Sequence, residues 1–269
     1  TSSKRGLIYI PNRKYTSDDS IWTKSNSDLT WYYNYGSSPT PSLSGSQLQF
    51  VPMLWGHPDE TSGTTFYDTI KALKISGQNI THVFAFNEPD GDTKTGGSSI
   101  APDKAASIWI RELEPLRKLG IQVGAPAVTG SQRGIDWLKD FFENCKGKCN
   151  ADFMPIHWYG YSPSNNFEGL AGYVGQIMGT YPKLKIWVTE YALSRVALQE
   201  SQAFYNQSAA WFDKMEYFDS NITHYSWFGS FRSDVSNVGP NAAMLTQNGK
   251  LTDIGSWYLG GSATGAVPQ

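Results

Sequence analysis

The stretch Phe84-Ala85-Phe86-Asn87-Glu88-Pro89-Asp90 is an apolar, β-prone run that ends in an Asn-Glu pair and stops at once on Pro and Asp. This pattern is typical of a buried strand that delivers a carboxylate to a loop. A second run, residues 186–192 (Ile-Trp-Val-Thr-Glu-Tyr-Ala), carries Glu190 in the same way. Two glutamates at the C-terminal ends of buried strands form the smallest set of side chains that can cleave a glycosidic bond.

Six more β-prone runs occur in the chain, which makes eight in all. They lie at residues 6–10, 29–36, 48–56, 121–128, 153–160 and 224–231. Helical patterns follow most of the runs, at residues 64–76, 101–119, 132–144, 166–180, 197–218 and 252–259, and residues 16–19 could open a short helix. This alternation predicts parallel strands joined by right-handed crossovers.

Eight such units in roughly 250 residues are the content of a (β/α)8 barrel, also called a TIM barrel. We therefore predict a single α/β barrel domain over residues 1–269, because no internal linker is long enough to demand a second domain. The competing fold is a doubly wound open sheet. That fold usually has a glycine-rich phosphate turn after its first strand, and residues 10–13 (Ile-Pro-Asn-Arg) are not such a turn.

The composition points away from several classes of partner. A formal net charge of −2 argues against nucleic acid or an anionic membrane surface. No apolar run approaches the roughly 20 residues of a membrane span, and Thr1 in place of Met suggests a processed start. Ten Trp, fifteen Tyr and thirteen Phe are more rings than a core usually needs. Rings that line a groove hold sugars, so we expect a carbohydrate ligand, the alternative being extra core and surface aromatics.

Cysteines and sequons suggest an oxidising compartment. Cys145 and Cys149 are the only cysteines, and we expect a local disulfide between them, the alternative being half a zinc site. Sequons begin at Asn79, Asn206 and Asn221, although a motif this short also occurs by chance. Both features fit a secreted or cell-wall protein. The four histidines, at positions 57, 82, 157 and 224, lie on separate elements, so we expect no metal and no cofactor.

The barrel brings the two glutamates together. Loops after each strand converge on one rim, so Glu88 after the fourth run and Glu190 in the seventh face the same mouth. Carboxyl groups about 5–5.5 Å apart would cleave with retention of configuration, and a wider separation would leave room for water and predict inversion. The alternative for each glutamate alone is an exposed or salt-bridged strand end.

Three pieces of sequence together resemble glycoside hydrolase family 128, the fungal and bacterial β-1,3-glucanases. They are residues 86–90 (Phe-Asn-Glu-Pro-Asp), 157–160 (His-Trp-Tyr-Gly) and 187–192 (Trp-Val-Thr-Glu-Tyr-Ala). The resemblance covers nearly the whole chain and implies that Glu88 is the general acid/base and Glu190 the nucleophile. It also implies that Asn87 hydrogen-bonds the 2-hydroxyl of the sugar that is cleaved, the alternative being a turn-forming Asn before Pro.

Further aromatic and polar residues at strand ends are candidates for substrate binding. His157 and Tyr159 share one strand face, and we expect one of them to hydrogen-bond a catalytic carboxylate, the alternative being a satisfied core histidine. Trp158 points the other way unless the strand end is distorted. Trp227 would stack under the sugar, or else close the barrel or pack under the last helix. The remaining candidates for the groove, each of which could instead be ordinary packing, are Tyr33, Asn34, Tyr35 and Trp55.

The function that fits these observations is a retaining β-1,3-glucan hydrolase, and we expect endo action and a monomer. Two other functions remain open from the sequence. One is a β-glucan-binding protein without catalysis on the same fold, which would show affinity for laminarin without turnover. The other is a barrel glycosidase for another β-linked polymer such as mannan or cellulose, which a substrate panel would reveal.

Overall fold

Parallel strands form the centre of the molecule. The computed structural model describes residues 4–58, 62–161, 165–214 and 221–269. One six-stranded sheet has the order β3-β2-β1-β8-β7-β6, and β4 pairs with β5. All of these pairings are parallel. The strands are β1 (Arg5–Ile8), β2 (Leu29–Tyr33), β3 (Gln49–Phe50), β4 (His82–Val83), β5 (Gln122–Val123), β6 (Phe153–Tyr161), β7 (Lys185–Ser194) and β8 (Ile222–Trp227).

The two sheets follow each other in the order of a (β/α)8 barrel. A parallel bridge between Met53 and Phe84 connects the end of the β3 segment to β4, and another between Gly124 and Phe153 connects β5 to β6. Each strand therefore neighbours the next one along the chain, and β1 returns to pair with β8. A single β-bridge, and not a continuous ladder, joins β3 to β4 and likewise β5 to β6. The predicted α/β barrel class agrees with this arrangement.

Three strands are much shorter than the sequence predicts. The expected runs at 48–56 and 121–128 contain Pro52 and Pro126, which have no N–H to donate to a ladder. The expected run at 84–90 follows β4 and does not coincide with it. That segment still bonds to both neighbours, because the amide of Phe84 donates to Pro52 and the amide of Glu88 donates to Ala127.

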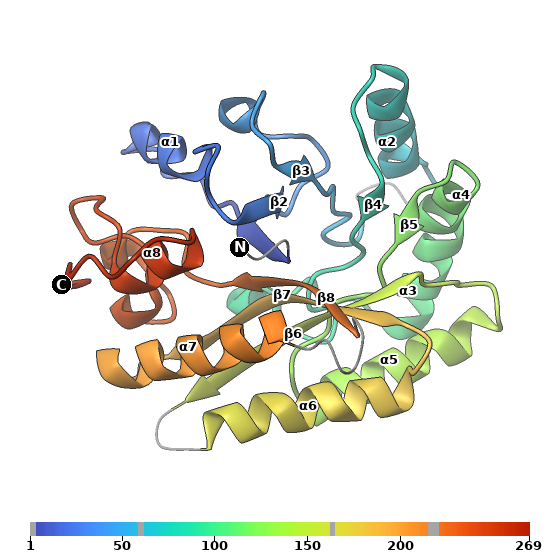
Figure 1. Ribbon diagram of the computed structural model, residues 1–269. Coiled ribbons are helices and arrows are strands. Elements are labelled where there is room, and N and C mark those ends of the chain that lie inside the picture. The colour runs from blue at the N-terminus through green and yellow to red at the C-terminus, as the bar shows by residue number, and fades with distance from the viewer. Residues whose placement is uncertain (1–3, 59–61, 162–164, 215–220) are drawn as a thin grey trace.

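Long helices lie outside β6, β7 and β8, whereas short segments such as α1 lie beside β1 and β2 (Figure 1). The expected helix at 101–119 is three pieces, with a π-helical turn from Trp109 to Leu113, and Pro115 lacks the N–H that a continuous helix needs. Residues 215–218 of the expected helix at 197–218 lie outside the described residues. The helices are α1 (Asp19–Trp22), α2 (Thr65–Ile75), α3 (Pro102–Ile108), α4 (Glu114–Arg117), α5 (Gln132–Cys145), α6 (Asn166–Thr180), α7 (Leu198–Lys214) and α8 (Asp253–Tyr258).

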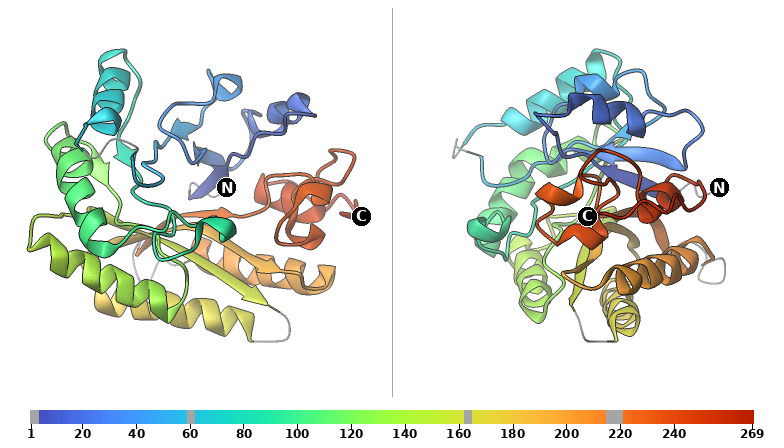
Figure 2. Two further views of the ribbon diagram at one scale, coloured as in Figure 1. Left: turned by 180° about the vertical axis from the view of Figure 1, so that it is seen from behind. Right: turned by 90° about the vertical axis from the view of Figure 1, so that its left-hand side faces the viewer.

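A layer of rings fills the barrel below its C-terminal mouth. Trp187 on β7 is its centre, with the ring of His224 stacked at a centroid distance of 3.5 Å and that of Phe153 at 4.6 Å. Gly6 on β1 fits this layer because a Cβ there would lie 2.1 Å from the Trp31 ring. The layer consists of Trp31, His82, Phe84, Phe153, Trp187 and His224. Figure 2 shows the helices outside the strands that carry these rings.

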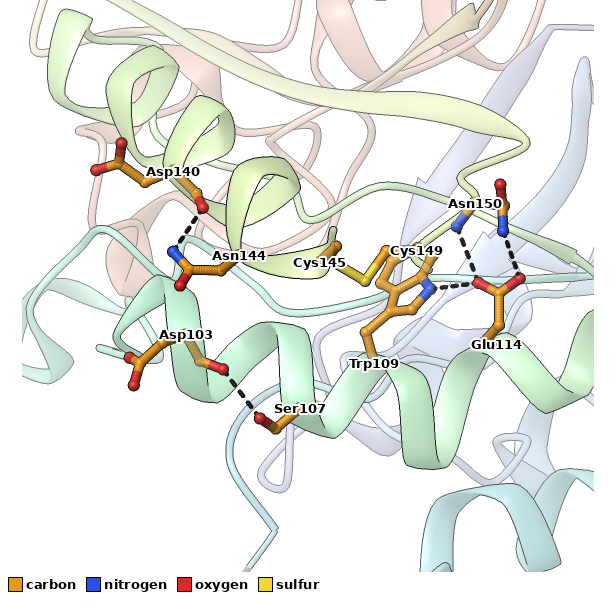
Figure 3. The surroundings of a disulfide bond; sticks show 9 residues. All are labelled: Asp103, Ser107, Trp109, Glu114, Asp140, Asn144, Cys145, Cys149 and Asn150. Carbon is orange, nitrogen blue, oxygen red and sulfur yellow. Dashed lines mark hydrogen bonds between the residues drawn. A yellow bond between two sulfur atoms is a disulfide. The ribbon is translucent and has the colours of Figure 1, made fainter. Parts of the chain in front are cut away.

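The predicted disulfide between Cys145 and Cys149 is present. It closes the turn after α5 next to α4, as Figure 3 shows. There, Glu114 accepts hydrogen bonds from the Trp109 indole and from the backbone and side-chain amides of Asn150. The disulfide thus holds the start of the segment that leads into β6 against the end of α5, and the hydrogen bonds of Asn150 to Glu114 hold it against α4.

Two surface features bear on the expected location. The side chains of Asn79 and Asn206 are exposed and that of Asn221 is half-buried, and their glycosylation stays a prediction. None of the described helices is both long enough and apolar enough to cross a membrane.

Candidate active site

Glu88 lies at the barrel mouth on a strained backbone. Its φ is +41°, in the left-handed region that non-glycine residues seldom adopt. Backbone bonds fix this conformation, since the amide of Glu88 donates to Ala127 and the amide of Asn87 donates to Trp55. Conformations of this kind persist where the surrounding structure enforces them, and they cluster at functional sites.

A β-bulge turns Glu190 into the same mouth. In the β6–β7 ladder Ile156 pairs with Val188, but His157 pairs with Glu190, so Thr189 is an extra residue on β7. Because side chains alternate along a strand, this extra residue places Glu190 on the same side as Trp187 of the ring layer. The carboxylate is buried, with a side-chain exposure of 8%.

Two phenols hold the Glu190 carboxylate, one on each oxygen. Tyr35 donates from its hydroxyl to Oε1 at 2.5 Å, and Tyr159 donates to Oε2 at 2.7 Å. Burial and the charge of Glu190 raise the pKa of both tyrosines well above its ordinary value, so both remain proton donors. Sequence reasoning placed Tyr35 in the groove as a sugar contact, whereas its hydroxyl here binds the carboxylate.

His157 bridges the two carboxylates. Its Nδ1 lies 2.9 Å from Oε1 of Glu88 and 3.4 Å from Oε2 of Glu190. One ligand atom from each of these three residues can be chosen so that all lie within 4.8 Å of one another. We expected His157 or Tyr159 to contact a carboxylate of the pair, and both do.

The three groups are electrostatically coupled. Burial raises the pKa of Glu190; the charge of His157 opposes this rise, the charge of Glu88 adds to it, and the tyrosine hydrogen bonds oppose it. Burial lowers the pKa of His157, but the charge of Glu190 and the hydrogen bond and charge of Glu88 outweigh burial and raise it. A proton taken up by His157 therefore changes the affinity of Glu190 for protons, and the reverse also holds.

Asn87 is buried beside Glu88, and one of its polar atoms has no partner among the described residues. Its Nδ2 donates to the carbonyl of Gly96, whereas its Oδ1 has no hydrogen-bond partner among the described residues. A buried acceptor without a donor is costly.

Two of the expected substrate contacts serve the protein itself. Tyr33 is fully buried, and its hydroxyl donates to the carbonyl of Thr189 at the bulge. Asn34 uses its amide for Ser38 and Thr40 and so shapes the loop after β2. The expectation that Tyr33 lines the groove is therefore wrong, whereas a sugar contact of the half-buried Asn34 stays a prediction. Trp55, by contrast, is 37% exposed next to Asn87 and stays a candidate.

Trp158 and Trp227 also lie away from the mouth. Trp158 stacks on Phe204 of α7 at 5.7 Å, outside the barrel, as strand alternation indicated. Trp227 has no exposed surface, and its indole donates to the carbonyl of Ala242. It packs edge-on against Tyr205 of α7, so the expectation that it stacks under a sugar is wrong and the alternative of packing holds.

Comparison with known proteins places this chain in a family. A family profile described as "Glycosyl hydrolase catalytic core" matches residues 6–258. The chain belongs to this family. It is 30% identical over 266 residues to alkali-sensitive linkage protein 1 of Schizosaccharomyces pombe, a match that covers 96% of this chain and 44% of that protein. The chain thus spans less than half the length of this curated relative.

Two solved structures of glycoside hydrolase family 128 are similar over nearly their full length. An endo-β-1,3-glucanase from Lentinula edodes has a TM-score of 0.74 and 25% identity, covering 95% of this chain and 98% of that one. An exo-β-1,3-glucanase from Aureobasidium namibiae has a TM-score of 0.75 and 23% identity, covering 95% of each chain. The resemblance to family 128 that the sequence suggested is confirmed.

Within this glycosyl hydrolase core, Glu88, His157 and Glu190 form the one group of side chains in the described residues that could ligate a metal. A histidine that binds metal normally donates its second N–H to an acceptor. The buried Nε2 of His157 has no partner among the described residues. The environment of His157 therefore fits a single hydrogen bond from Nδ1 to Glu88 better than it fits metal ligation.

Sequence reasoning missed one ring at the mouth. Phe228 directly follows β8, and its ring lies edge-on to Tyr159 at 5.8 Å. Strand alternation could have revealed this ring. His224 points into the ring layer, and residues 226 and 228 share its face because side chains alternate along a strand.

Proposed function

We propose that this chain hydrolyses β-1,3-glucan with retention of configuration, with Glu190 as nucleophile and Glu88 as general acid/base. The observation that carries the proposal is the separation of the pair, whose facing oxygens lie within 4.8 Å. Retaining glycosidases hold their carboxyl groups about 5–5.5 Å apart, and inverting ones about 6.5–9.5 Å apart. A pair with one oxygen of each carboxylate this close fits the shorter, retaining separation better than the longer one.

The surroundings of each glutamate support its role. Glu190 receives two phenol hydrogen bonds, which favour its charged form, and it is anchored on a continuous strand. The hydrogen bonds offset part of the rise that burial gives the pKa of Glu190, and they fix the carboxylate in place as a nucleophile requires. Among the described residues, the Glu88 carboxylate has a single hydrogen-bonded neighbour, His157, and the side chain is 15% exposed, so its carboxyl can reach the oxygen of a leaving sugar.

The reaction then has two balanced steps. In the first, Glu190 attacks the anomeric carbon, the glycosidic bond breaks, and Glu88 gives its proton to the leaving oxygen. In the second, Glu88 takes a proton from water, the water oxygen attacks the same carbon, and the bond to Glu190 breaks. We propose that Asn87, whose Oδ1 has no partner among the described residues, hydrogen-bonds the 2-hydroxyl of the sugar that is cleaved.

The choice of substrate rests on the relatives. The two similar structures are named β-1,3-glucanases, one endo and one exo. We propose a β-1,3-glucan chain as substrate, endo action, and a monomeric protein. The disulfide supports an extracellular or cell-wall location, because such bonds persist in oxidising compartments.

Reducing-sugar release from laminarin and curdlan tests the proposal. Glu190→Gln should lower the rate by at least about 1,000-fold, as expected for loss of a nucleophile. Proton NMR of the first products from the wild type should show the β-anomer. A variant that keeps near-full activity, or a first product with the α-configuration, would overturn the assignment of roles.

Two further measurements separate the alternatives. Laminarin, mannan and cellulose as parallel substrates should give turnover on laminarin alone. Calorimetry with laminarin distinguishes an enzyme from a binder, since affinity without turnover is the result expected of a binding protein. The product ladder from long β-1,3-glucan should be a spread of oligomers for endo action, and one dominant small product would indicate exo action.

A further inference from the structure

The ladder between β6 and β7 continues past the catalytic pair. His157 pairs with Glu190, and the register then runs without a break to Tyr161, which pairs with Ser194. Four residues of β6 beyond His157 therefore rise above the carboxylates. A paired strand, and not a loop, holds these residues in place.

Alternate residues of this ladder point in opposite directions. Trp158 stacks on Phe204 of α7, and a Cβ on Gly160 would meet Trp158 and Asn166 of α6. These even-numbered positions face the outer helices. The odd-numbered positions 157, 159 and 161 consequently face the mouth, and Tyr161 lies about 6.6 Å further along the strand than Tyr159, at about 3.3 Å per residue.

Tyr161 is also unusually exposed for an aromatic residue on a strand. Its exposed fraction is 63%, and among the described residues Trp55, at 37%, is the one other exposed large aromatic side chain. Trp55 accepts the amide hydrogen bond of Asn87, so it lies on the β4 side of the mouth. Tyr161 lies on the β6–β7 side. The pair Glu88 and Glu190 comes from the same two sides.

We propose that Tyr161 is a stacking platform for a glucosyl unit beyond the cleaved bond, opposite a second platform at Trp55. This inference rests on the proposed glucan substrate and adds a specificity residue to it. A flat ring offers the apolar face of a sugar a large contact at little cost in conformational entropy. With one ring on each side of the pair, the site holds a chain that continues in both directions from the cleaved bond.

Steady-state kinetics of Tyr161→Ala on laminarihexaose and on laminaritriose test the proposal. The hexaose occupies more of the mouth, so its KM should rise by about five- to ten-fold, the size expected for loss of one ring contact. Its kcat should stay within about two-fold, because Tyr161 does not touch the reacting atoms. The KM for the triose should change less. Tyr161→Phe should keep the wild-type KM, because stacking needs the ring and not the hydroxyl.

Tyr181→Ala is the matched control, since it removes a half-buried ring after α6, at the opposite end of the barrel. Thermal unfolding of each variant verifies that it is folded. If Tyr161→Ala unfolds, Tyr161→Gln is used in its place. An unchanged KM for laminarihexaose in a folded variant would overturn the proposal.

Binding to a protein that cannot turn over separates this inference from the proposed function. Glu190→Gln should bind laminarihexaose by calorimetry, and adding Tyr161→Ala should weaken that binding by the same five- to ten-fold, or about 1–1.4 kcal/mol. If the wild type neither cleaves nor binds the hexaose, the proposed function itself fails. If the wild type cleaves it and the two Kd values agree, only the role of Tyr161 fails.

Discussion

Tyr35 donates a 2.5 Å hydrogen bond to Oε1 of Glu190 from a backbone position with a φ of +61°. A non-glycine residue in the left-handed region costs on the order of 1–3 kcal/mol, so the fold stabilises this position from elsewhere. The amide of Met53 donates to the carbonyl of Gly36, next to Tyr35, and so ties this segment to the β3 side of the barrel. A strained residue is thus used to bring a second phenol to one carboxylate.

Tyr35→Phe should lower kcat/KM on laminarin by about 10- to 100-fold, since a hydrogen bond to a charged group contributes about 1.5–3 kcal/mol. The lost donor held the pKa of Glu190 down, so that pKa should rise further. The acid limb of kcat/KM against pH should therefore move to higher pH. Tyr33→Phe is the control, because the Tyr33 hydroxyl binds a backbone carbonyl. An acid limb that stays in place would contradict this role.

Arg5 ties β1 to the segments that close the barrel. Its guanidinium donates to Tyr225 of β8, to Asp28 and to the carbonyl of Tyr258 at the end of α8. Arg5→Met should lower the free energy of unfolding by about 3–5 kcal/mol, because Asp28 is left buried without its partner. Urea denaturation measures this loss.

The double variant Arg5→Met with Asp28→Asn checks the cause of that loss. Removing the second charge should recover part of the stability, because the buried Asp28 carboxylate is gone, whereas Asp213, which also pairs with Arg5, is 28% exposed and keeps its hydrogen bond from Tyr225. If the double variant loses more free energy of unfolding than the two single variants lose together, the unpaired charge is not the main cost.

Acid should destabilise the protein through the ring layer. Burial, with the charges of His82 and Lys4, lowers the pKa of His224 to about 3. Below pH 6.5 the His224 imidazole binds a proton in the unfolded chain but not in the folded chain. The free energy of unfolding therefore decreases as the pH falls toward 3. His224 alone should cost up to about 1.4 kcal/mol per pH unit in this window.

His224→Phe keeps a ring stacked on Trp187 but cannot be protonated. Urea midpoints at pH 7 and pH 4.5 should differ less for this variant than for the wild type. His57→Gln, at an exposed position, serves as the control and should behave as the wild type does. Equal pH dependence of all three proteins would show that His224 is not responsible.

Removing the disulfide should have a small, local effect. The loop between Cys145 and Cys149 is short, so the chain-entropy contribution is about 2 kcal/mol, which corresponds to a shift in Tm of several degrees. Cys145→Ala with Cys149→Ala should therefore remain folded and active on laminarin. Differential scanning calorimetry of this variant, beside wild type with and without reductant, checks the size. Loss of the whole fold would show that the bond is a framework and not a local link.

The sequence predicted much of the site because barrel geometry follows from order along the chain. Glu88 and Glu190 follow the fourth and seventh β-prone runs, and that count is enough to place them on one rim. Alternation along one strand also predicted that His157 and Tyr159 share a face. These inferences needed only local periodicity and the rule that C-terminal ends of parallel strands meet.

The errors arose where contacts come from distant segments. Trp227 and Tyr33 lie at strand ends, where the predicted groove would be. Helices and neighbouring strands cover both side chains, so neither is exposed. Asn34 uses its amide to hold its own loop, and its contact with a sugar stays a prediction. Exposure depends on what packs against a residue, and a single strand does not carry that information.

The sequence by itself determined the eightfold alternation, the two glutamates at the mouth and the nearby cysteine pair, because each depends on short-range spacing. Only the tertiary structure decided how the glutamates are held. The extra residue Thr189 turns Glu190 toward the mouth, and Glu88 and Tyr35 adopt left-handed backbone conformations that their residue types disfavour. Bulges and strained dihedrals raise the local free energy, and packing and hydrogen bonds from distant elements offset this rise. No local sequence pattern therefore predicts them.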